Sequence, residues 1–187
     1  DYKENKGLFS IEKRIEYAKI VFNKTMRYDF LINKYFCEQS QLIEEKLMPD
    51  NLVMNMCKKE NLRYGENPHQ GAAYYTPVGE ENIWEKIQGK KLSYNNYFDM
   101  ESAINIVYEF DQLCCVIVKH SNPCGFGLGV NNVEAYLNAV STDPISYFGG
   151  IVAFNCEVDL DVAIELNKSF LECIVAPSFS IDALEEL

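Results

Sequence analysis

The sequence predicts a three-layer α/β domain in its second half. Three apolar runs, at residues 114–118, 151–154 and 173–176, alternate with two helical patterns at 133–140 and 159–171. Strands that are apolar on both faces and separated by helices are typical of a sheet covered by helices on both sides. The last eight residues, SIDALEEL, fit two turns of a further helix.

Before this domain, residues 10–36 fit a helix with Ser10 as its N-cap, because apolar residues follow Ser10 at three- and four-residue spacing. The alternative is a second helix that begins near Asp29. Residues 37–62 are mixed and charged and contain Pro49. They are predicted to form a linker with a short helix or strand inside it, and to hold the domain boundary.

Two loops rich in turn residues come next. The stretch LRYGENPHQGAAYYTP predicts a loop and then a short strand at 72–75. The stretch GKKLSYNNYFDMESA predicts a second loop, with Asp99 as the N-cap of a helix that reaches about Gln112.

Composition narrows the class of protein. A net charge of −11 argues against non-specific nucleic-acid binding. The sequence contains no run of eighteen apolar residues, so no membrane span is predicted. The seven cysteines are an odd number and form no CxxC pair, which favours reduced thiols and a cytoplasmic protein. The polar first residues show no secretory signal, and both ends are those expected of a piece of a longer chain.

Lys119 and His120 form the first candidate site, because they follow a buried strand directly and ligands in α/β proteins are often held at strand ends. The imidazole could take a proton near neutral pH, and the ammonium could stabilise developing negative charge. The alternative interpretation is structural: a hydrogen-bonded histidine beside a solvated lysine.

Three further patterns leave alternatives open. Arg63 and Tyr64 suit a phosphate or carboxylate ligand, or belong to a loop that satisfies only itself. The pair Gly149–Gly150 permits close approach of a ligand, or simply a turn with positive φ. Cys124 could act as a nucleophile with a histidine as base. Zinc is rejected, because the H-x-E and P-C-x-x-C pattern of the nucleic-base deaminases is incomplete here.

Five stretches, LRYGENPHQ, GKKLSYNNYFDMESA, VIVKHSNPCGFG, DPISYFGGIVAFN and ECIVAPSFS, resemble in order and spacing the bifunctional purine biosynthesis enzymes, which join IMP cyclohydrolase to AICAR transformylase. The early helix is similar to the last helices of their cyclohydrolase part. The resemblance implies that residues 1–48 are the end of a cyclohydrolase domain with the linker. Residues 49–187 would be the N-terminal part of a transformylase domain with a cytidine-deaminase-like fold.

The resemblance also implies an activity: formyl transfer from 10-formyltetrahydrofolate to the 5-amino group of the nucleotide AICAR, in a homodimer. His120 would be the base and Lys119 would stabilise the transition state. The expected nucleotide contacts are Arg63, Tyr64, Asn96, Gly149 and Glu172. Departures from the family pattern occur at Leu128, in the short GLGVNN connection, and at Tyr147. The alternative for the isolated fragment is a non-catalytic nucleotide-binding or dimerisation module.

Overall fold

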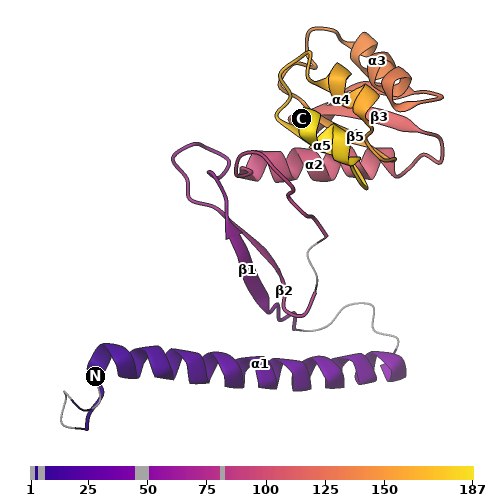
Figure 1. Cartoon of the computed structure of the whole chain (residues 1–187). Coiled ribbons are helices and arrows are strands. Elements are labelled where there is room, and N and C mark those ends of the chain that lie inside the picture. Colours follow the sequence, from indigo (N-terminus) through magenta and orange to yellow (C-terminus); the bar gives the residue numbers. More distant parts are fainter. Residues whose placement is uncertain (1–2, 4–6, 45–50, 81–82) are drawn as a thin grey trace. The chain divides into compact units, whose positions relative to one another are not determined.

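The computed structural model describes residues 3, 7–44, 51–80 and 83–187. The chain divides into two compact units: Asp1–Lys59 with Tyr75–Glu85, and Glu60–Tyr74 with Lys86–Leu187. Figure 1 labels most of the elements of both. In the described part of the chain, no helix combines the length and the hydrophobicity needed to cross a bilayer.

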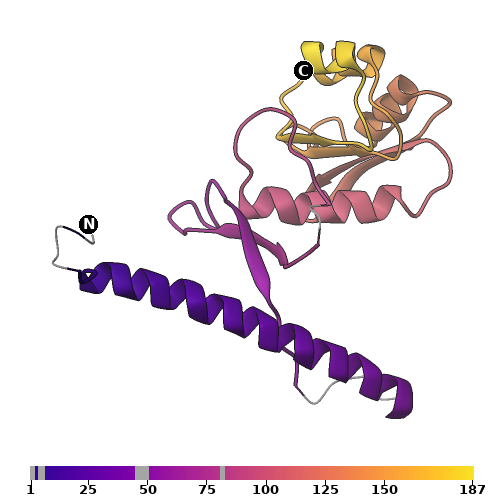
Figure 2. The same ribbon diagram turned by 60° about the horizontal axis from the view of Figure 1, so that its bottom comes forward.

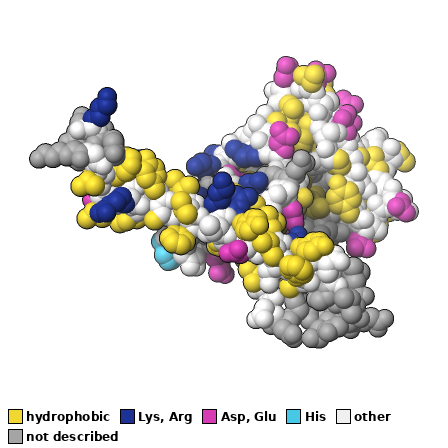
Figure 3. Space-filling model, turned by 90° about the horizontal axis from the view of Figure 1, so that it is seen from below, with side chains coloured by type: hydrophobic (Ala, Val, Ile, Leu, Met, Phe, Trp, Pro, Cys, Tyr) yellow, Lys and Arg dark blue, Asp and Glu magenta, His cyan; other side chains and the backbone are white. Residues whose placement is uncertain are grey.

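The first unit contains one long helix, α1, at Ile11–Glu44. Ser10 caps it as predicted, because its Oγ accepts a hydrogen bond from the Lys13 N–H at 3.3 Å. The helix continues eight residues beyond the predicted end at residue 36, without a break at Asp29. Most of the apolar side chains described on this helix are exposed, with Phe22 at 71%. Figure 3, seen from below, shows hydrophobic side chains at the surface together with lysines and arginines.

Strands β1 (Met56–Asn61) and β2 (Ala73–Pro77) form a two-stranded sheet. The predicted strand at 72–75 is therefore confirmed with bounds moved by one or two residues, and the short element expected within the linker is a strand. One backbone hydrogen bond lies beyond each end of the paired strands: Leu62 N donates to Ala72 O at 2.9 Å, and Val78 N donates to Asn55 O at 2.9 Å.

The second unit is built on a four-stranded mixed sheet in the order β4-β3-β5-β6. The predicted strands are confirmed as β3 (Cys114–Lys119), β5 (Ile151–Phe154) and β6 (Cys173–Val175). Strand β3 runs antiparallel to β5, and β5 runs parallel to β6. The sheet is consequently mixed, with helices on both faces.

Strand β4 (Asn122–Leu128) was not expected, because Pro123, Gly125 and Gly127 predict a loop. It pairs antiparallel with β3 at the edge of the sheet, where proline is tolerated. The glycines are needed for a different reason. A Cβ on Gly125 would lie 2.3 Å from the Ala139 carbonyl oxygen, and one on Gly127 would lie 2.3 Å from that of Ala135. The glycines therefore let helix α3 lie directly on the strand.

Helices cover both faces of this sheet, as predicted. Helix α2 (Tyr94–Val107) packs on one face, against β3 and β5. Helices α3 (Asn132–Thr142), α4 (Leu160–Leu166) and α5 (Ile181–Glu186) lie on the other (Figures 1 and 2). The core on that second face includes Cys115, Ile117, Val152, Phe154, Tyr136, Val162 and Leu166.

Two helices of this unit have bounds that differ from the prediction. Helix α2 begins after Ser93 rather than Asp99 and ends at Val107, and α4 ends at Leu166 rather than near 171. Ser93 and Asn96 form a capping box: Ser93 N donates to Asn96 Oδ1 at 2.8 Å, and Asn96 N donates to Ser93 Oγ at 3.2 Å. The third helical residue of such a box is more often Glu or Gln, so the sequence does not mark Ser93 clearly as the N-cap.

Candidate functional site

One edge of the four-stranded sheet gathers most of the predicted site residues. Val118 of β3 is paired with Ile151 of β5, and Ile151 is paired with Cys173 of β6. Because β3 is antiparallel to β5 while β5 is parallel to β6, the end of β3 lies beside the starts of β5 and β6. At these strand ends, β3 finishes with Lys119, Gly150 directly precedes β5, and Glu172 directly precedes β6.

The turn that follows β3 is a tight hairpin. Lys119 pairs with Asn122, so only His120 and Ser121 form the loop. Both have positive φ, of 52° and 60°, as in a type I′ turn. His120 is exposed, and no hydrogen bond to its imidazole is found among the described residues. The role of His120 as a base stays a prediction.

Lys119 is directed toward the turn that precedes β5. Its Nζ donates a hydrogen bond to the Phe148 carbonyl oxygen at 2.9 Å. Gly149 in this turn has φ of 71°, and its N–H donates to the Phe170 carbonyl oxygen at 2.7 Å. A Cβ on Gly150 would lie 2.8 Å from Ile117 Cγ2 and 3.4 Å from Lys119 Cγ. The turn therefore needs glycine twice, once for its φ and once for its close contact with the end of β3.

Arg63 and Glu172 meet at this edge although they are 109 residues apart in the chain. Arg63 Nη2 donates to Glu172 Oε1 at 2.6 Å and to the Tyr64 hydroxyl at 3.2 Å. The Arg63 guanidinium carbon also lies 4.9 Å from the centre of the Tyr64 ring. The hydrogen bond to Glu172 is the main cause that raises the pKa of Arg63. In turn, Glu172 N donates to the Gly150 carbonyl oxygen at 3.0 Å, which joins this pair to the glycine turn.

The loop that carries Arg63 divides into two parts. Asn67 and Gln70 satisfy each other, with Asn67 N donating to Gln70 Oε1 at 2.9 Å and Gln70 N donating to Asn67 O at 3.0 Å. Arg63 and Tyr64 instead are held by the second loop, through Arg63 N to Leu92 O at 2.8 Å and Tyr94 N to Tyr64 O at 3.0 Å. The end of the loop therefore satisfies its own polar groups, whereas Arg63 and Tyr64 are bonded to the second loop and lie beside Glu172.

Asn96 differs from the other predicted contacts, because its carboxamide is already engaged. Its Oδ1 accepts from Ser93 N at 2.8 Å and from Ser93 Oγ at 2.9 Å, and the residue is 7% exposed. It stabilises the start of α2, which adjoins the Arg63–Tyr64 loop. A contact between Asn96 and a ligand stays a prediction.

Cys124 lies on β4, where the pairing register with β3 shifts. Its Sγ contacts the Ile117 carbonyl oxygen at 3.5 Å, and burial is the main cause that raises the pKa of the thiol. A raised pKa leaves less thiolate at neutral pH, which weighs against a nucleophilic cysteine.

In the residues that the structure describes, no group of three or more His, Cys, Asp or Glu side chains is arranged to hold a metal ion.

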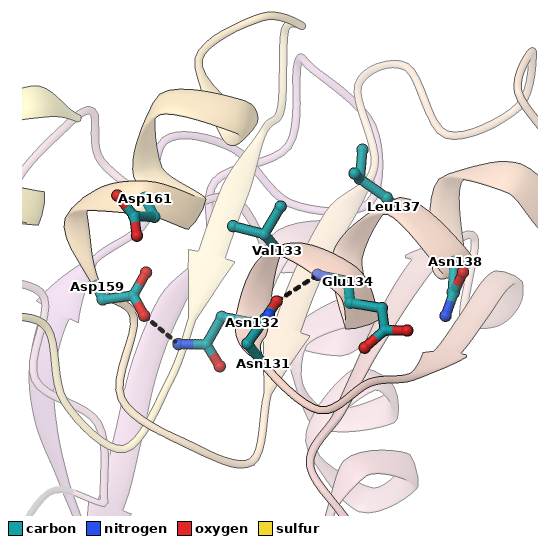
Figure 4. Close-up of a pocket in the computed structure, with 8 residues that line it drawn as sticks. All are labelled: Asn131, Asn132, Val133, Glu134, Leu137, Asn138, Asp159 and Asp161. Carbon is teal, nitrogen blue, oxygen red and sulfur yellow. Dashed lines mark hydrogen bonds between the residues drawn. The ribbon is translucent and has the colours of Figure 1, made fainter.

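A hollow of about 410 Å³ lies elsewhere, at the N-termini of α3 and α4 (Figure 4). These helices follow β4 and β5, so the hollow lies at the opposite edge of the sheet from Lys119. Its polar groups are helix caps: Asn131 Oδ1 accepts from Glu134 N at 2.8 Å, and Asn132 Nδ2 donates to Asp159 Oδ2 at 3.1 Å. Its three carboxylates disfavour an anionic ligand, and it contains no predicted site residue.

The fold and the site together define an α/β domain in which Lys119 and His120 lie at the same edge of the sheet as the ion pair of Arg63 and Glu172. The family model described as the AICARFT/IMPCHase bienzyme matches residues 1–187, so the chain belongs to this family.

The similar proteins carry the name "Bifunctional purine biosynthesis protein PurH". One from Persephonella marina is 47% identical over 98% of the chain. Others, from Caldicellulosiruptor saccharolyticus and Bacillus cereus, are each 46% identical over 100% of the chain. The chain spans only 36–37% of the length of these relatives.

Proposed function

We propose that the protein to which this chain belongs transfers a formyl group from 10-formyltetrahydrofolate to the 5-amino group of AICAR, and also carries an IMP cyclohydrolase. The observation that carries the transferase proposal is the sheet edge itself. There an exposed histidine and a lysine from one strand end lie beside a glycine turn and an Arg-Glu pair. The relatives' name, a bifunctional purine biosynthesis protein, supports the same role.

The chemistry needs a base, because the 5-amino group of AICAR is a weak nucleophile. In the proposed step the amine nitrogen forms a bond to the formyl carbon and gives a proton to the His120 imidazole. The bond from that carbon to the folate nitrogen then breaks, and this nitrogen takes up a proton as tetrahydrofolate leaves. The Lys119 ammonium stabilises the negative charge that develops during the transfer.

The nucleotide is proposed to lie against Arg63, Tyr64 and Glu172. Arg63 uses Nη2 for Glu172 and Tyr64 in the described part of the chain, and a guanidinium has five N–H donors in all. The ion pair therefore orients the guanidinium while other donors point elsewhere, which suits a phosphate oxygen. Gly149 and Asn96 are proposed to line the same site.

Some further proposals rest on the resemblance. They are the cytidine-deaminase-like classification of the second unit, the boundary between cyclohydrolase and transformylase parts near residue 48, the homodimer, and the cytoplasmic location. A second candidate function applies to the isolated chain, as a nucleotide-binding or dimerisation module without catalysis. The observation that favours it is that the chain spans about a third of its relatives' length.

Steady-state kinetics of the full-length protein test the proposal. Replacing His120 by Ala should lower kcat for formyl transfer on the order of a hundred- to ten-thousand-fold, as for loss of a general base. Lys168→Ala is the matched control, because the Lys168 side chain forms a surface ion pair with Glu165, and its loss should leave the rate unchanged. Activity of the His120→Ala protein within about threefold of wild type would exclude His120 as the base.

A further inference from the structure

A carboxylate on α2 holds the turn that presents His120. Asp99 Oδ1 accepts a hydrogen bond from the Ser121 backbone N–H at 2.7 Å and lies 3.3 Å from the Ser121 hydroxyl. The two residues are 22 positions apart, and the contact joins a helix on one face of the sheet to the β3–β4 hairpin. A second contact lies within the turn itself, where Asn122 Nδ2 donates to the His120 carbonyl oxygen at 2.9 Å.

The turn needs such support because of its residues. Among the described residues, His120 and Ser121 are the non-glycine residues with positive φ. Two-residue hairpin loops of this kind usually contain Asn-Gly or Asp-Gly, for which positive φ is least costly. A histidine and a serine persist in this conformation only where surrounding contacts hold them, and such residues cluster at functional sites.

Asp99 is available for this contact because it does not cap its own helix. Helix α2 begins at Tyr94, so Asp99 lies in the second turn and its carboxylate is not needed by the first N–H groups. The residue is half-buried on a helix that packs against β3 and β5. Its position relative to the end of β3 is therefore set by the packing of the core.

We infer that Asp99 is a positioning residue: through Ser121 it keeps the β3–β4 turn in the conformation that directs His120 to the reacting amine. The inference rests on the proposed formyl transfer for its kinetic readout. A misplaced base slows the chemical step while the nucleotide contacts at Arg63 and Glu172 stay intact. The effect should therefore fall on kcat rather than on the KM for AICAR.

Four variants of the full-length protein test this inference. Asp99→Ala should lower kcat on the order of tenfold to a hundredfold, with the KM for AICAR within about threefold of wild type. Asp99→Asn keeps an acceptor oxygen and should retain most of the activity. Adding Ser121→Gly to Asp99→Ala should restore kcat to within about threefold, because glycine adopts positive φ without strain. Glu101→Ala, an exposed carboxylate on the same helix, is the matched control and should behave as wild type.

Three results would overturn the inference: an Asp99→Ala kcat within about threefold of wild type, a loss that Ser121→Gly does not restore, or an equal loss in Glu101→Ala. Crystal structures of the wild-type and Asp99→Ala proteins provide a readout that does not depend on the activity. Residues 120 and 121 should leave positive φ in the variant, and an unchanged turn would refute the positioning role. If the wild-type protein shows no formyl transfer, the proposed function fails, and the structures alone decide the role of Asp99.

Discussion

Replacing Gly127 by Ala should destabilise the second unit, because the structure leaves no room for a methyl group between β4 and α3. An added Cβ would lie 2.3 Å from the Ala135 carbonyl oxygen, 2.5 Å from Ala139 N and 2.7 Å from Asn138 Cβ. Two of these atoms belong to the helix backbone, so a side-chain rotation cannot relieve the overlap. Strand and helix must separate by roughly 1 Å to restore ordinary contact distances.

The cost follows from this displacement. Inserting a methyl group into a well-packed core typically costs about 1–3 kcal/mol, and the intrinsic preference for Ala over Gly in a strand returns at most about 1 kcal/mol of it. For a unit of about 120 residues (60–74 and 86–187), each kcal/mol shifts the midpoint of thermal unfolding by about 4 °C. We therefore expect the melting temperature of the Gly127→Ala chain to fall by several degrees, up to about 12 °C.

The assay is thermal unfolding followed by circular dichroism, with Gly71→Ala as the matched control. A Cβ on Gly71 meets no atom within 4 Å and Gly71 is exposed, so this change should be neutral or stabilise by about 0.4–1 kcal/mol. Equal melting temperatures for the two variants would refute the argument that β4 needs glycine in order to receive α3.

Two further predictions concern the sheet edge. Arg63→Ala should weaken AICAR binding to the full-length protein about tenfold or more in titration calorimetry, since a hydrogen bond to a charged group contributes roughly 1.5–3 kcal/mol; an unchanged affinity would remove Arg63 from the proposed site. Cys124 should react with iodoacetamide at pH 7 more slowly than a free cysteine in a peptide, and its rate should rise only at higher pH, because burial raises the pKa of its thiol and lowers the thiolate fraction. Equal rates at pH 7, measured by mass spectrometry of the Cys124 peptide, would contradict this.

Local sequence patterns are sufficient to predict an element when its signal, such as a helix cap or an apolar run, lies within the element itself. Ser10 marks the start of α1 because an N-cap is a local hydrogen bond. The apolar runs at β3, β5 and β6 were recognised because strands covered on both faces must be apolar throughout. Lys119 was placed correctly at a strand end for the same reason, since it is the first charged residue after a buried run.

Other features depend on partners that are distant in the chain, and no local pattern contains them. Strand β4 resembles a loop until α3 is seen to lie on its glycines, and Asp99 resembles a helix cap until the hairpin turn is seen to bind it. Local patterns in the sequence indicate the other strands of the larger sheet and its helices but not β4, and the resemblance to a family indicates which residues to examine. The ion pair of Arg63 with Glu172 and the hydrogen bond from Ser121 to Asp99 exist only in the folded chain, because strand order and helix packing bring these distant segments together.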